Sequence, residues 1–256
     1  SFRPVQGDDW PLEAASMAVR TTAIATTRDA LRAPAIAHRR YQAPAAKVPA
    51  ARANAAAPLP PTRTPRLMPL PDVRQGTTYT CGTASLMSIL AYFGWKGGDP
   101  NERAMAQELG TTWRNGTEPT DLIRMGRKLG LRVDQREHLT LDDLTREVRA
   151  GHPVMVAYQA YATEGGPVPH KKPWSEDWGD GHWSIVIGID DQNVYLEDPS
   201  MLGKRGFIPR AEFLERWHDT DSQNQPVYQQ LGLVFSSDTP KKNLNTVEVK
   251  NLAYVP

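Results

Sequence analysis

The chain has 256 residues, of which 39% are hydrophobic and 23% charged, and its formal net charge at pH 7 is +1. This composition is typical of a globular protein that can bury its own core, and the balanced charge gives no general reason to expect a nucleic-acid partner. The single cysteine excludes an internal disulfide and a cysteine-based zinc cluster, and no apolar run near 20 residues predicts a membrane span.

Residues 1–66 differ in composition from the rest and form a predicted N-terminal arm. Ala, Pro and Arg dominate the arm, which has six positive charges in excess and so leaves the remainder of the +1 chain at −5. We expect a helix over residues 12–31 and an extended chain over 33–66, where proline is too dense for long helices. The charges of the arm are spaced and aromatic residues are few, so we expect no nucleic-acid partner. The arm is predicted to be a linker, or a prosegment that contacts the oppositely charged body.

The lone cysteine, Cys81, lies where the first helix of the body is predicted to begin. The segment Cys81–Tyr92 is mostly small and apolar and is followed by Gly94, which favours a buried helix over these residues. A helix N-terminus stabilises a thiolate through its dipole and its unpaired N–H groups. Cys81 is therefore a candidate nucleophile, and the alternative is a small buried hydrophobic side chain.

The elements that follow are predicted to be helices first and strands afterwards. Helical patterns cover residues 118–129 and 141–150, and strand patterns begin at 153–158. A short helix over 209–217 and a late strand over 229–235 are predicted nearer the C-terminus. This order predicts an α+β fold and not alternating βαβ units.

A β-hairpin is predicted around His182, which lies near the start of an apolar strand. Residues 181–189 are rich in β-branched side chains, with His182 near the start, and a second strand over 194–197 ends at Asp198. An odd number of residues in the turn around 190–193 sets Asp198 on the same face as His182 and diagonal to it; a two-residue turn sets them on opposite faces. We expect the first arrangement, in which the carboxylate holds the imidazole. The alternatives are a structural histidine and an Asp-Pro strand terminator.

These residue types together suit nucleophilic catalysis. Cysteine catalysis needs a thiolate, a base that later serves as an acid, and a group that orients the base. Cys81, His182 and Asp198 can fill these roles in that order. Gln75, on the loop before the predicted helix, can supply an amide donor that stabilises an oxyanion together with the backbone N–H of the nucleophile. The alternative for Gln75 is a glutamine that faces solvent.

In these motifs the chain resembles the papain-like bacteriocin-processing peptidases, also called double-glycine leader peptidases. The resemblance depends on Gln75 six residues before Cys81, on Gly181-His182 at the start of a strand, and on Asp198-Pro199-Ser200 sixteen residues after the histidine. It extends over roughly residues 70–235.

The resemblance implies a papain-like cysteine peptidase fold, with a helical lobe that carries the cysteine and an antiparallel sheet lobe that carries the histidine and aspartate. It also implies that Cys81 is the nucleophile, His182 the base, Asp198 its orienting residue and Gln75 the oxyanion donor. The domain would span residues 67–237, between the N-terminal arm and a polar tail over 238–256. The chain departs from the transporter-linked members because it has no membrane-spanning run and no GxxxxGK[ST] phosphate loop. This departure weakens any transfer of the double-glycine preference.

Two tryptophans are candidate substrate-binding residues. Trp178 ends a long loop rich in Gly and Pro, and Trp183 follows His182 directly. Either could shield the ion pair from water, and the alternative is aromatic packing in the core. The six histidines do not have metal-ligand spacing, so we expect no metal or other cofactor.

Three functions are compatible with the motifs. The first is hydrolysis of a peptide or protein substrate by a cysteine peptidase. The second is a transglutaminase-like transamidase or deamidase, because those proteins share the Cys, His, Asp order. The third is a binding module that docks a leader peptide without cutting it. A single thiol without disulfides is compatible with the bacterial cytoplasm or with secretion.

Overall fold

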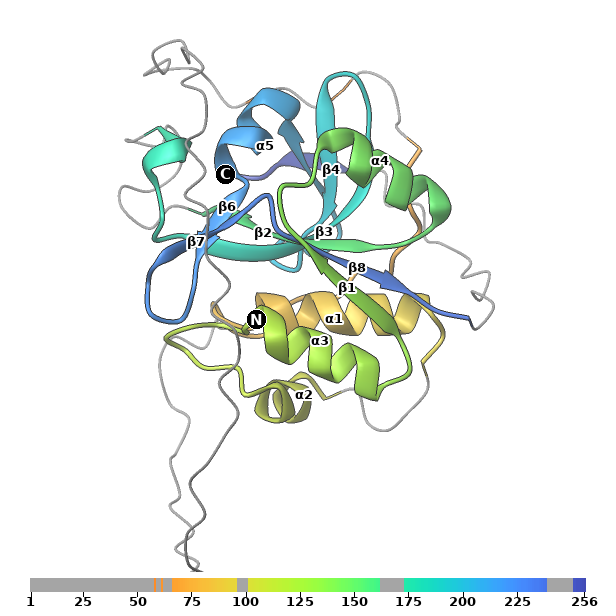
Figure 1. Cartoon of the computed structure of the whole chain (residues 1–256). Coiled ribbons are helices and arrows are strands. Elements are labelled where there is room, and N and C mark those ends of the chain that lie inside the picture. The colour runs from red at the N-terminus through yellow and green to blue at the C-terminus, as the bar shows by residue number, and fades with distance from the viewer. Residues whose placement is uncertain (1–57, 59–60, 62–65, 96–100, 162–172, 239–250) are drawn as a thin grey trace, which may run out of the picture. The chain divides into compact units, whose positions relative to one another are not determined.

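The computed structural model describes residues 58, 61, 66–95, 101–161, 173–238 and 251–256 (Figure 1). The helix predicted over 12–31, the extended arm and its contact with the body lie outside the described residues. The arm therefore stays a prediction.

The helices begin and end at residues whose local chemistry explains the boundaries. The side chain of Asn101 accepts from the Arg103 N–H at the start of α2, and Thr140 and Asp143 form a reciprocal capping box at the start of α4. Gly151 ends α4 with φ 75°, a left-handed conformation that favours glycine. The helices are α1 (Cys81–Tyr92), α2 (Glu102–Leu109), α3 (Pro119–Lys128), α4 (Leu141–Ala150) and α5 (Arg210–Arg216), with a 3₁₀ turn η1 (Trp174–Glu176). The predicted helices over 81–92 and 141–150 are confirmed.

Seven of the described strands form one sheet in the order β1-β8-β2-β3-β4-β5-β9, and β6 and β7 pair separately. Every neighbouring pair is antiparallel except β5 and β9. The strands are β1 (Arg132–Arg136), β2 (Val154–Gln159), β3 (Gly181–Ile189), β4 (Asn193–Glu197), β5 (Arg205–Pro209), β6 (His218–Thr220), β7 (Pro226–Gln229), β8 (Gly232–Ser236) and β9 (Leu252–Tyr254). The fold is α+β, as predicted.

The late strand predicted over 229–235 is wrong in its first part. Gln229 ends β7, and Gln230 has φ 45°, a left-handed conformation that interrupts an extended strand. Strand β8 begins only at Gly232. The chain therefore turns from the small sheet into the large one within a segment that looked continuous in sequence.

Helices cover both faces of the large sheet, with α1 and α3 on one face and α4 and α5 on the other (Figure 1). The two-residue period of the strands divides the core accordingly. Met155 and Ala157 of β2 pack in the cluster that includes α1, whereas Val154 and Val156 pack in the cluster that includes α4 and α5. Among the described residues, no helix has the length and apolar character needed to cross a bilayer.

Candidate active site

Cys81 is the first residue of α1, and its side chain is 5% exposed. The start of this helix has no side-chain cap and no acidic residue in its first turn. The first N–H groups of a helix lack intrahelical partners, so this terminus favours negative charge at the position of the sulfur. Gly82 is required next to the cysteine, because a Cβ there would lie 2.9 Å from the Thr117 Cβ and 3.1 Å from the Trp183 ring.

The imidazole of His182 is held by Asp198. His182 Nε2 lies 3.0 Å from Asp198 Oδ1, and the two side chains are 6% and 0% exposed. Because Nε2 is directed at the carboxylate, the other ring nitrogen, Nδ1, is left for the thiol of Cys81, with which the ring interacts.

The groups around His182 together outweigh the effect of burial on its pKa. Burial, the largest single effect, lowers the pKa of His182, but attraction to Asp198 and Cys81 and hydrogen bonds with both raise it above its ordinary value. Burial also raises the pKa of Asp198, and the charge and hydrogen bond of His182 outweigh that effect, so that this pKa is lowered. The arrangement therefore favours an imidazolium paired with the Asp198 carboxylate.

Asp198 accepts hydrogen bonds from four groups. Its Oδ1 accepts from His182 and from the Ser200 N–H at 2.9 Å, and its Oδ2 accepts from the hydroxyls of Tyr161 at 3.1 Å and Tyr158 at 3.3 Å. The rings of Tyr158 and Tyr161 also meet the imidazole edge-on, at centroid distances of 5.8 and 5.2 Å. A buried carboxylate with this many donors keeps both its charge and its orientation.

A β-bulge in β3 brings His182 and Asp198 onto one face. Nearest the turn Ile189 pairs with Val194, so the turn has four residues and not the expected odd number. The register then shifts between Val186 and Gly188, and the extra residue in β3 reverses the alternation of faces. The predicted proximity is confirmed, but the bulge produces it and not the turn.

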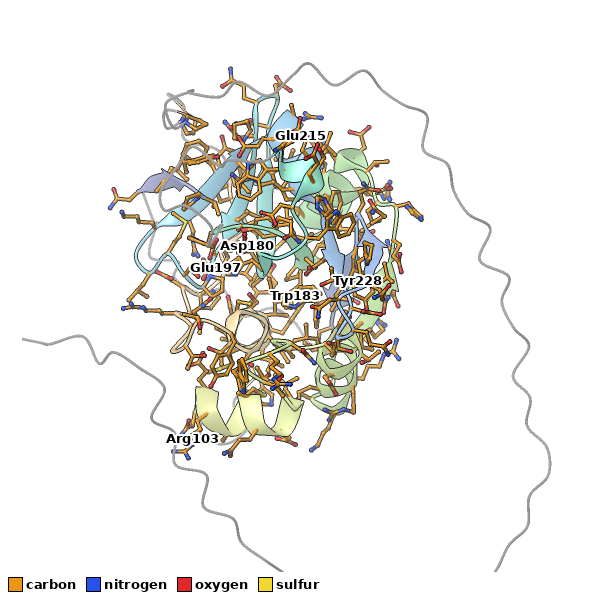
Figure 2. All side chains as sticks on the ribbon, turned by 90° about the vertical axis from the view of Figure 1, so that its left-hand side faces the viewer. Arg103, Asp180, Trp183, Glu197, Glu215 and Tyr228 are labelled. Atoms are coloured by element: carbon orange, nitrogen blue, oxygen red, sulfur yellow. The ribbon has the colours of Figure 1, made fainter. Side chains whose placement is uncertain are left out.

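The segment that precedes Gln75 makes hydrogen bonds to the bulge and to a buried ion pair. The N–H of Met68 donates to the carbonyl of Ile187, the bulged residue, at 2.7 Å. The ion pair of Glu197 and Arg205 is 1% and 6% exposed, with Glu197 in the interior of the molecule (Figure 2). Arg205 also donates to the carbonyl of Leu70, and Glu197 accepts from Val73 N–H at 3.1 Å.

Gln75 is held by its backbone N–H and by both the oxygen and the nitrogen of its side-chain amide. Its backbone N–H donates to the Pro199 carbonyl at 2.9 Å, and its Oε1 accepts from the Ser200 hydroxyl at 3.0 Å. Its Nε2 donates to the carbonyl of Thr77, on the loop that leads to Cys81, at 2.8 Å. One amide hydrogen is therefore used in the loop, and the second is left for another acceptor.

The two predicted substrate-binding tryptophans both contact other residues of the body. The Trp183 indole is 6% exposed and packs in the core cluster that includes α1, and its Nε1 donates to the Thr117 carbonyl at 3.0 Å (Figure 2). Trp178 is half-buried, and its ring lies 4.2 Å from that of His218. Their role toward substrate stays a prediction.

Sequence reasoning missed the donors around Asp198. Ser200 belonged to the motif but had no assigned role, although it contacts both Asp198 and Gln75. Tyr158 pairs directly with His182 in the β2–β3 ladder, so the register of that pair could have found it. Nothing in the sequence marks Tyr161, because its position depends on a turn after β2. No three His, Cys, Asp or Glu side chains of the described segments come together in a way that could hold a metal ion.

The model of the Peptidase_C39 like family matches residues 68–225, which include all four candidate catalytic residues. The chain belongs to this C39-like peptidase family. The family resemblance found in the sequence is thereby confirmed. A search of curated proteins found no match to this chain.

Several solved structures are similar to the chain at low identity. A double-glycine motif protease from an AMS/PCAT transporter, solved in complex with its leader peptide, is 18% identical with a TM-score of 0.43, covering 68% of this chain and 94% of that one. The peptidase domain of Streptococcus ComA is 16% identical with a TM-score of 0.44, covering 68% and 100%. A C39-like protein from Bacillus anthracis is 18% identical with a TM-score of 0.47, covering 69% and 98%.

Proposed function

We propose that this C39-like chain hydrolyses peptide bonds, with Cys81 as nucleophile, His182 as base and acid, and Asp198 as the residue that orients His182. The observation that carries the proposal is the environment of the His182 ring, which is buried, hydrogen-bonded to Asp198 and in interaction with the Cys81 thiol. Membership of a peptidase family supports the same reaction class.

In the proposed mechanism, the Cys81 thiolate attacks the carbonyl carbon of the substrate. The oxyanion that forms is stabilised by the Cys81 N–H and by the free amide hydrogen of Gln75. When the intermediate collapses, the C–N bond breaks and the His182 imidazolium gives its proton to the leaving amine. His182 then takes a proton from water, the hydroxide attacks the thioester, and the C–S bond breaks. The acid leaves and the thiolate–imidazolium pair is restored.

The substrate is proposed to be a peptide or a protein. The transamidase and deamidase alternatives use the same acyl-enzyme and differ in which carbonyl is attacked and which nucleophile releases it. The binding-module alternative needs no thiol, and the retained Cys81 beside His182 supports turnover instead.

Product identification tests the proposed reaction. The full chain is incubated with a peptide library that includes Gly-Gly sequences and glutamine-containing peptides, with and without hydroxylamine as a second nucleophile. We expect mass spectrometry to find backbone cleavage with water added across one bond. Intact peptides with glutamine converted to glutamate, or to the hydroxamate, would show a deamidase or a transamidase. Binding without any product would show a binding module.

A further inference from the structure

We propose that residues 251–256, defined here as the clasp, position Asp198 through Tyr161. This inference depends on the proposed function, because it assigns a positioning role within the same site. The clasp follows residues 239–250 in sequence and was expected to belong to a polar tail. In the structure it packs on the body, and its last residue contacts the Tyr161 backbone.

The clasp is anchored to the edge of the large sheet. Strand β9 pairs in parallel with β5, with Leu252 opposite Arg205 and Tyr254 opposite Phe207. Val255 is 0% exposed, and its N–H donates to the Phe207 carbonyl at 3.1 Å. Gly206 makes room for it, because a Cβ at that position would lie 2.6 Å from Val255 Cγ2. Val255 is therefore the side chain that fixes the clasp to the core.

A buried arginine connects the clasp to helix α5. Arg216 is 0% exposed, and its guanidinium lies 3.7 Å from the centroid of the Trp174 ring. It donates to the Tyr254 hydroxyl at 2.6 Å and to the Pro256 carbonyl at 3.3 Å, and it pairs with Glu212. The guanidinium thus fixes both the side chain and the backbone at the end of the clasp.

The Pro256 carbonyl is also the acceptor for the Tyr161 backbone. The N–H of Tyr161 donates to it at 2.8 Å. Tyr161 has φ 57°, a left-handed conformation that costs a non-glycine residue energy and persists only where its surroundings hold it. The clasp supplies one of the contacts that hold this backbone.

The Tyr161 side chain contacts two residues of the proposed triad, Asp198 and His182. Its hydroxyl donates to Asp198 Oδ2 at 3.1 Å, and its ring meets the His182 ring at 5.2 Å and 76°. Burial and the nearby Asp198 raise the pKa of Tyr161, so the hydroxyl stays protonated and remains a donor. This hydrogen bond lowers the pKa of Asp198 and keeps the carboxylate charged.

The test compares Tyr161→Phe, Val255→Ser and the double variant in cleavage by the full chain. Tyr161→Phe is expected to lower kcat about tenfold to a hundredfold, as expected when a charged group loses a hydrogen bond, with little change in KM. The acid limb of the rate is expected to move to higher pH, because the Asp198 pKa rises without this donor. Val255→Ser is expected to cause the same changes, and in the Tyr161→Phe background to add little.

Matched controls separate positioning from folding. Tyr195→Phe removes a tyrosine–aspartate hydrogen bond of 2.6 Å at the hairpin turn, and Val227→Ser changes a valine that is 44% exposed. Both are expected to keep the wild-type kcat and acid limb. If Val255→Ser does not fold, Tyr254→Phe, which removes a partner of Arg216, replaces it. Wild-type kinetics in Tyr161→Phe, or independent losses that multiply in the double variant, would overturn the inference. Activity that survives Cys81→Ala would instead overturn the proposed function.

Discussion

Cys81→Ala is expected to reduce peptide turnover by at least about 10³-fold, because removal of a nucleophile abolishes the acyl-enzyme route. Cys81 is 5% exposed at the start of α1, so the loss of one sulfur atom should leave the helix and its surroundings intact. Turnover is followed by mass spectrometry and peptide affinity by calorimetry. We expect affinity to remain while cleavage is lost, and unchanged cleavage by the variant would contradict the assignment of Cys81.

Gln75→Ala is expected to lower activity less than Cys81→Ala does. Loss of the proposed oxyanion donor is expected to lower kcat by about 10²–10³-fold, less than loss of the proposed nucleophile. The backbone N–H of Gln75 keeps its bond to the Pro199 carbonyl in the variant, so the loop retains that anchor. A wild-type kcat in Gln75→Ala would show that the amide serves only to order the loop through Ser200 and Thr77.

Arg205→Leu is expected to lower the free energy of unfolding by about 3–5 kcal/mol, because it leaves the Glu197 carboxylate buried without its cation. The Glu197 side chain is 1% exposed, and Arg205 also donates to the Leu70 carbonyl. The loss is measured by urea unfolding, with the midpoint and slope fitted together.

Two further variants test this explanation. Arg132→Leu removes the ion pair with Asp238, in which the two side chains are 64% and 84% exposed, and should change stability little. Glu197→Gln combined with Arg205→Leu also removes the unpaired buried carboxylate, and it should recover part of the lost free energy of unfolding. A cost for Arg205→Leu no larger than that for Arg132→Leu would contradict the role of the buried pair.

The helices of the site could be predicted because their signals are local. The apolar run from Cys81 to Tyr92 and the cap residues around 141–150 determine those boundaries within a few positions. The predicted order, helices before strands, indicated the α+β class, although β1 precedes α4 and α5 follows β5 in the structure. The meeting of His182 and Asp198 was predicted from strand alternation, yet it depends on the bulge at Ile187.

The rest of the site depends on contacts between distant segments. The carbonyl of Ile187 accepts from Met68, more than a hundred residues earlier in the chain, and no local pattern encodes such a bond. Strand β9 has three residues and pairs with β5 across a long separation, so period-two alternation could not reveal it. Tyr161 was missed because its place depends on a left-handed backbone after β2 and on a bond to Pro256, which follows that strand.

The pH dependence of Cys81 alkylation tests the central claim most directly. Because the pKa of His182 is raised by Asp198 and Cys81, the imidazolium persists above the ordinary histidine range and stabilises the thiolate. Iodoacetamide labelling followed by mass spectrometry should therefore stay fast below neutral pH in the wild-type chain. It should fall in His182→Ala to the profile of an ordinary thiol with a pKa of about 8.5. Slow labelling of both proteins with that same ordinary profile would contradict a thiolate–imidazolium pair.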